Sequence, residues 1–146
     1  MKVSFFEYLR TGFLGNIGPG VDRRAVHREL GTPLSALAQS ADFWDAVQWG
    51  YSALCVRFTN DGKVDAFGMY VTGIKTDDKL SFEEWDGKTH FSEDWLLEQL
   101  RLRSISYERK EDNEGTSLVI TEGKVAIEFV TARVTRILSP ASEWSL

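Results

Sequence analysis

Three stretches of the chain place apolar residues at the spacings of three and four that are typical of amphipathic helices. Their apolar stripes are Phe5, Phe6 and Leu9, then Val26 and Leu30, and finally Leu96, Leu97 and Leu100. Asp22 and Ser92 stand where helix N-caps belong, while Gly12 and Gly31 follow the first two stripes as stop signals. The pattern predicts one helix over residues 3–10, a second between Asp22 and Gly31, and a third that begins after Ser92.

Apolar and polar residues alternate over residues 51–58, which predicts a strand with one buried face. Residues 60–63 read Asn-Asp-Gly-Lys, and their turn chemistry predicts a hairpin whose second strand covers residues 64–72. Further strands are predicted over residues 105–109, 117–121, 124–130 and 134–138.

The two ends of the chain share a weak internal repeat. Placing Val56, Phe58 and Val64 over Ile127, Phe129 and Val134 aligns helix, strand, turn and strand, with one residue of difference in the turn. We therefore expect an α+β fold with helices packed on an antiparallel sheet, in tandem units 1–75 and 92–139 around an acidic connector, 76–91. The whole chain, 1–146, is expected to form a single domain. Chance matching of apolar strands is the alternative explanation of the repeat.

Charge is unevenly distributed along the sequence. The chain has a net charge of −5, and residues 77–95 contain seven acidic residues against two lysines, which equals the whole imbalance. Aromatic residues Phe82, Trp85, Phe91 and Trp95 are interleaved with these acids. Such a segment combines rings that bury area in an interface with carboxylates that steer a cationic surface.

The usual signatures of catalysis and of cofactor binding are missing from the sequence. Glycines between residues 12 and 20 precede a helix, but their spacing is neither GxGxxG nor a Walker A pattern. Cys55 lies in the middle of a predicted strand, and His27 and His90 are far apart. We expect no cofactor, no bound metal and no enzymatic activity.

The best candidates for chemistry are the carboxylates Glu83, Glu84 and Asp86 near His90, because clustered carboxylates hold divalent cations or shift each other's pKa values. A metal-dependent enzyme is therefore kept as an alternative, beside the simpler interpretation of a solvated acidic loop. Nucleic-acid binding is not expected, because the chain is acidic overall and has no reader motif.

One part of the sequence resembles known bacterial proteins. The motif consists of Val26, Leu30, Gly31, Thr32, Pro33, Trp49, Tyr51, Val56, Phe58, Asn60, Gly62, Lys63 and Val64. This helix, LG-x-P, W-x-Y and hairpin pattern resembles small α+β domains of outer-membrane assembly lipoproteins of the BamE type. It is also similar to the tandem units of the β-lactamase inhibitor protein and to some toxin immunity proteins. The resemblance implies a non-catalytic protein that binds another protein.

The chain departs from two of these groups. Its start has no lipoprotein signal or lipidation cysteine, and its single cysteine cannot form the internal disulfides of secreted inhibitors. No run of about 18 apolar residues is present, so no membrane-spanning segment is expected, and we expect a cytoplasmic location.

The favoured hypothesis is a protein of the immunity or inhibitor type that neutralises a toxin domain with a basic surface. The predicted contact residues are Asp77, Asp78, Glu83, Glu84, Trp85, Asp86 and Asp94, followed by Asp42 and Trp44. A structural module that self-associates through its tryptophans and sheet edges is a further alternative, and the oligomeric state stays open.

Overall fold

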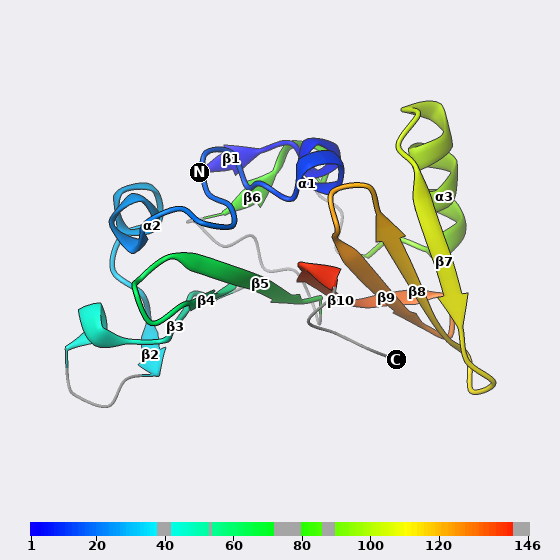
Figure 1. Ribbon diagram of the computed structural model, residues 1–146. Helices are drawn as coiled ribbons and strands as arrows, with labels where there is room; N and C mark the ends of the chain where they lie inside the picture. Colours follow the sequence, from blue (N-terminus) through cyan, green and yellow to red (C-terminus); the bar gives the residue numbers. More distant parts are fainter. Residues whose placement is uncertain (38–41, 53, 72–79, 86–89, 142–146) are drawn as a thin grey trace.

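An antiparallel sheet of eight strands runs through the molecule (Figure 1). The computed structural model describes residues 1–37, 42–52, 54–71, 80–85 and 90–141. The strands are β2 (Ser35–Leu37), β3 (Gln48–Gly50), β4 (Cys55–Phe58), β5 (Val64–Tyr70), β7 (Tyr107–Glu111), β8 (Thr116–Thr121), β9 (Ala126–Val130) and β10 (Arg133–Ser139). Their order in the sheet is β2-β3-β4-β5-β10-β9-β8-β7, so β5 and β10 are central and β2 and β7 form the edges.

Three α-helices form where the apolar stripes predict them, at α1 (Phe5–Thr11), α2 (Arg23–Leu30) and α3 (Glu93–Leu102). Asp22 caps α2 by accepting a hydrogen bond from the backbone N–H of Arg24, and Ser92 caps α3 by accepting one from Trp95. Gly12 ends α1 in the left-handed conformation, with φ of 81°. Short 3-10 helices, η1 (Phe43–Asp45) and η2 (Glu83–Trp85), interrupt the connections.

A second, small sheet joins the start of the chain to the segment before η2. Strand β1 (Lys2–Val3) pairs in parallel with β6 (Ser81–Phe82), which brings Val3 beside Phe82. The rings of Phe5 and Phe82 meet nearby, with centroids 5.2 Å apart. The segment at residues 80–85 therefore lies against the N-terminal helix.

The helices pack on one face of the large sheet, and the main core lies between the two layers. Tyr8 of α1 contacts Phe67 of β5, His27 of α2 contacts Trp49 of β3, and Glu93 of α3 bonds to Ser117 of β8. The ladder places the alternate residues on the opposite, outer face of the sheet. One row of this outer face runs through Cys55, Gly68, Leu138, Ala126 and Ile120 on five neighbouring strands.

The aligned residues of the two hairpins occupy matching places. Phe58 lies opposite Val64 in the β4–β5 hairpin, and Phe129 lies opposite Val134 in the β9–β10 hairpin. All four side chains are buried, and both ladders contain a register shift next to these pairs. The two hairpins meet where β5 pairs with β10, so each four-stranded half presents its last strand to the other.

The α+β prediction is confirmed, but the first strand differs from the alternation pattern. The pattern predicts one strand over residues 51–58, whereas the structure forms β3 before Tyr51 and β4 from Cys55 onward. The Tyr51 N–H donates to the Leu54 carbonyl, and its hydroxyl donates to the Gly31 carbonyl at 2.8 Å. The first bond connects the end of β3 to the start of β4, and the second ties Tyr51 to the end of α2. Strands β2 and β3, which are short, were not expected.

Candidate functional site

Most aromatic residues of the acidic segment lie in the core. The sequence pattern predicted instead that they contact a partner at the surface. Phe82, Trp85 and Phe91 are each at most 9% exposed, and their rings surround Phe5 of α1 at centroid distances of 4.7–5.7 Å. Burial of large rings next to α1 explains why this segment is rich in aromatic residues. Trp85 is thus a core residue rather than an exposed contact residue.

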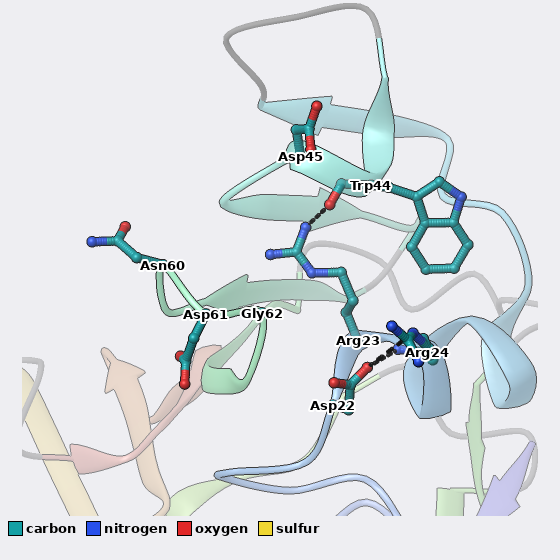
Figure 2. A pocket seen from close by; sticks show the side chains of 8 residues that line it. All are labelled: Asp22, Arg23, Arg24, Trp44, Asp45, Asn60, Asp61 and Gly62. Atoms are coloured by element: carbon teal, nitrogen blue, oxygen red, sulfur yellow. Dashed lines mark hydrogen bonds and ion pairs between the residues drawn. The ribbon is translucent and has the colours of Figure 1, made fainter.

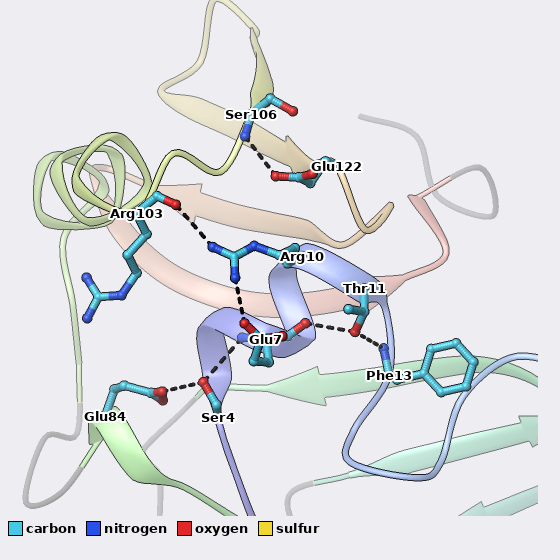
Figure 3. A network of polar contacts seen from close by, with 9 residues as sticks. All are labelled: Ser4, Glu7, Arg10, Thr11, Phe13, Glu84, Arg103, Ser106 and Glu122. Carbon is cyan, nitrogen blue, oxygen red and sulfur yellow. Dashed lines mark hydrogen bonds and ion pairs between the residues drawn. The ribbon is translucent and has the colours of Figure 1, made fainter.

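Glu84 has a structural role at the start of α1 (Figure 3). One carboxylate oxygen accepts a hydrogen bond from the Ser4 hydroxyl at 2.6 Å, and the other accepts one from the backbone N–H of Phe5 at 2.7 Å. A carboxylate at this position satisfies a free amide of the first turn and interacts favourably with the helix dipole. The carboxylate of Glu84 therefore ties η2 to α1.

The remaining predicted contact residues do not form one surface. Asp42 and Trp44 lie at η1, which precedes β3 near one edge of the sheet. Asp94 is exposed in the first turn of α3, which packs near the other edge, and Glu83 is exposed at η2. Asp77, Asp78 and Asp86 lie outside the described residues.

A cleft of about 480 Å³ opens next to η1 (Figure 2). Three segments that are distant in sequence supply its walls: the start of α2, η1 and the turn between β4 and β5. It is lined by Asp22, Arg23, Arg24, Trp44, Asp45, Asn60, Asp61 and Gly62. This cleft contains Trp44 from the predicted contact set and lies beside Asp42, which caps η1 by accepting from the Trp44 N–H at 2.9 Å.

Arg23 is held in place inside the cleft. Its guanidinium donates to the Trp44 carbonyl and lies over the Phe58 ring, with 5.1 Å from Cζ to the ring centroid. Its backbone N–H donates to the Gly62 carbonyl at 2.9 Å. Gly62 has a φ of +79°, and a Cβ on it would come within 2.8 Å of Arg23 Nε. The left-handed backbone of the turn favours glycine here, and a larger residue would also displace the Arg23 guanidinium.

Carboxylates from three segments surround this arginine. Asp22 accepts from the Arg24 backbone and from the Lys63 ammonium, and these two hydrogen bonds hold its pKa below the ordinary value. Asp45 and Asp61 are exposed on the other walls. Of the charged residues that line the cleft, three are acidic and two are basic. Figure 2 shows Asp45, Asn60 and Asp61 at the rim, around the space that the Arg23 side chain enters.

A cluster of rings supports the η1 side of the cleft. Trp44 is 37% exposed and contacts His27 and Phe43, each with a centroid distance of 4.9 Å. Beneath them Trp49 is fully buried, and its indole N–H donates to the Phe43 carbonyl at 2.8 Å. A partly exposed tryptophan on a rigid aromatic base is typical of contact residues in protein interfaces.

Sequence reasoning missed most of this cleft. Asp22 was identified as a helix cap and Asn60–Gly62 as a turn, and both interpretations agree with the structure. Neither pattern predicts that the start of α2 and this turn lie next to each other. The useful signal was the position of Asp42, Trp44 and Asp45 shortly before a strand that pairs with β4.

Metal-ligating side chains are not gathered into a site in the part of the chain that the structure describes. Among these residues, no group of three or more His, Cys, Asp or Glu side chains is arranged to hold a metal ion. Cys55 is half-buried, and burial raises the pKa of its thiol, which disfavours the reactive thiolate. None of the described helices is long and apolar enough to cross a bilayer.

Comparison of the chain with models of known families, with curated proteins and with solved structures gave no match.

Proposed function

We propose that the protein is a non-catalytic binding module, of the immunity or inhibitor type, that contacts a protein with a basic surface through the η1 side of the cleft. The observation that carries this proposal is the combination of the partly exposed Trp44 ring with Asp42 and Asp45, which flank it on η1. Interfaces place an aromatic residue at the centre of contact and use charges around it for steering.

The rigidity of this side supports the proposal. The Trp44 backbone accepts a hydrogen bond from Arg23, and its ring rests on rings anchored by the buried Trp49. A contact residue that is already ordered loses less conformational entropy when a partner binds. The aspartates on η1 then face a partner without a change in the backbone.

The negative net charge of the chain indicates that the partner has a positively charged surface. The net charge is −5, and the exposed carboxylates of Asp42, Asp45 and Asp61 lie at or beside the cleft. Complementary charge speeds the encounter of two proteins and selects against partners of the same sign. A toxin domain that binds nucleic acid has such a cationic surface, which would make it a suitable partner.

The test uses the product of the gene adjacent to the one that encodes this chain. We expect it to bind the wild-type protein, and we expect the double variant Asp42→Lys, Asp45→Lys to associate at least about tenfold more slowly at low salt. The Trp44→Ala variant should mainly raise the dissociation rate. Stopped-flow or surface-based kinetics measure both rates.

The matched control reverses two carboxylates far from the cleft, Glu108→Lys on β7 and Glu114→Lys in the turn after it. This variant has the same change in net charge but leaves η1 intact. If both double variants associate equally slowly, the effect comes from net charge alone. That result would contradict the proposal that the partner contacts the cleft. Absence of any binding by the adjacent gene product would contradict the immunity interpretation.

A further inference from the structure

The outer face of the sheet contains a hollow of about 150 Å³ where β4, β5 and β10 meet. It is lined by Gln48, Cys55, Arg57, Ala66, Phe67, Gly68, Tyr70 and Leu138. It shares no lining residue with the cleft at η1. The proposed contact with a basic partner does not involve this hollow.

Gly68 creates this hollow, and nothing in the backbone requires a glycine there. Its φ is outside the left-handed region, and a Cβ placed on it would meet only the Leu138 side chain, at an ordinary contact distance of 3.5 Å. A glycine in a central strand weakens the strand because it gives up side-chain packing and costs conformational entropy. Its missing side chain leaves space on the outer face.

Two of the side chains around Gly68, those of Cys55 and Ala66, are small and leave that space open. In the ladder, Gly68 lies opposite Cys55 on β4 and opposite Leu138 on β10, and Ala66 is two residues away on the same face. The floor of the hollow is therefore apolar. A polar rim is supplied by Gln48 and Arg57.

An exposed aromatic ring lies at the edge of the hollow. Tyr70 is 66% exposed although it is on a central strand, and it lies opposite Arg136 in the ladder. The Arg57 side chain is positioned by a hydrogen bond of 3.0 Å from its Nε to the Asp65 carboxylate. An apolar floor with a ring and a guanidinium at its rim is suited to another ring, through edge or stacked contacts and cation–π attraction.

We propose that this hollow binds a single aromatic side chain, phenyl or phenol, from a partner protein. An apolar cavity of about 150 Å³ in another protein is known to take benzene, so one ring is the right size. Pockets for free metabolites or drug-sized ligands are larger, at about 300–1,000 Å³. The small volume therefore favours a side chain over a free small molecule. The site is a second contact, independent of the basic partner of the cleft.

The test uses p-cresol, which has the ring of a tyrosine side chain, and Cys55 as the reporter. Cys55 is the only cysteine in the chain and lines the hollow, so its alkylation by iodoacetamide reports on this place alone. At a p-cresol concentration ten times its dissociation constant, alkylation should slow by about tenfold, because about a tenth of the sites stay empty. Half-saturation is expected at millimolar concentration, as befits one ring with few atoms.

A filling variant, Gly68→Val, separates occupancy from a general solvent effect. We expect Cys55 in this variant to be alkylated more slowly from the start and p-cresol to have no further effect. The control is Thr116→Val on the outer face of β8, where valine replaces a residue of nearly its own size. This variant should behave like the wild type. An alkylation rate that ignores p-cresol in the wild type, or that slows equally in Gly68→Val, would overturn the proposal.

Two further results decide the proposal without relying on the variant. In the wild type, titration with p-cresol should shift the backbone amide signals of Gly68 and Tyr70 but not that of Thr116, and shifts elsewhere alone would overturn the site. Cyclohexanol of equal concentration should protect Cys55 less, and equal protection would contradict the preference for an aromatic ring. Saturation below micromolar p-cresol would assign the hollow to a free ligand and overturn the docking of a side chain.

Discussion

The two four-stranded halves of the sheet have the same order of elements but differ in how their surfaces are packed. In both, a helix with a capped N-terminus covers a meander whose last strand lies at the centre, and Phe58–Val64 corresponds to Phe129–Val134. In the second half, Leu118, Ala126 and Ala141 form a small buried cluster of their own on the outer face. In the first half, the cleft at η1 and the hollow at Gly68 are left open.

The difference also appears in how each helix is attached. Helix α3 is fixed by Glu93, a carboxylate only 8% exposed that accepts from Arg109 Nε at 2.5 Å and from the Ser117 hydroxyl. Helix α2 instead relies on the ring cluster of His27 and Trp49 and on Arg23. The second half is stabilised by the buried carboxylate of Glu93 and by a buried cluster on its outer face, whereas the first half has the cleft at η1 and most of the lining of the hollow at Gly68. The contact proposed for a basic partner lies in the first half.

The largest expected effect tests whether the two hairpins are equivalent. Phe58→Ala and Phe129→Ala should each lower the free energy of unfolding by about 3–5 kcal/mol, because both rings are buried and leave a cavity. Denaturant unfolding measures these losses, with Leu102→Ala, 60% exposed, as a control that stays near the wild type. A large loss for one phenylalanine and a negligible loss for the other would contradict the shared plan.

Removal of the Glu93 carboxylate should have the next largest effect, and it is specific to the second half. Glu93→Ala leaves Arg109 and Ser117 without their buried acceptor, which should cost about 2–3 kcal/mol of unfolding free energy. Glu98→Ala on the same helix removes an exposed pair with Arg101 and should change little. Thermal unfolding distinguishes the two variants. Equal midpoints would show that the Glu93 hydrogen bonds do not stabilise the second half.

A smaller effect should be seen at the cleft as the pH is lowered. Because the folded-state pKa of Asp22 lies below its ordinary value, the stability it contributes is present above that ordinary value and is lost as the pH falls through the folded-state pKa. Asn is also a good helix cap but cannot ionise. The wild type should therefore lose more stability than Asp22→Asn between about pH 5 and pH 2 in acid titrations of unfolding. Parallel curves would show that the charge of Asp22 contributes nothing.

The smallest expected effect is at the hollow. Gly68→Val should raise the free energy of unfolding by about 0.5 kcal/mol, since valine favours a strand and the space accepts a side chain. Chemical denaturation of this variant beside Thr116→Val measures the change. A loss of more than about 1 kcal/mol would mean that Gly68 is needed for the fold and not for an open surface.

Local signals in the sequence were enough to predict most of the elements. Helix α2 lies between its predicted cap, Asp22, and its predicted stop, Gly31, and Ser92 caps α3 as expected. The β4–β5 turn was predicted because its chemistry depends on adjacent residues. Strands β2 and β3 were missed because three residues give too little alternation to recognise. They are held by pairing across the sheet, since β2 pairs with β3 and β3 pairs with β4.

The site was harder to predict because exposure is set by contacts between distant segments. The acids and rings of residues 82–91 looked like a surface, but Phe5 and Ser4, about eighty residues earlier, turn Trp85 and Glu84 inward. Likewise the cleft needs α2, η1 and a turn to meet. Local pattern gives the chemistry of each residue, whereas its accessibility depends on the packing of the whole chain.

The most direct test of the central claim is to map the surface that the adjacent gene product contacts, by backbone amide shifts on titration into the labelled protein. The account predicts that the strongest shifts fall in η1, the start of α2 and the turn at residues 59–63, and that β7 and α3 change little. Shifts concentrated on β7 and α3, with the cleft unchanged, would contradict it.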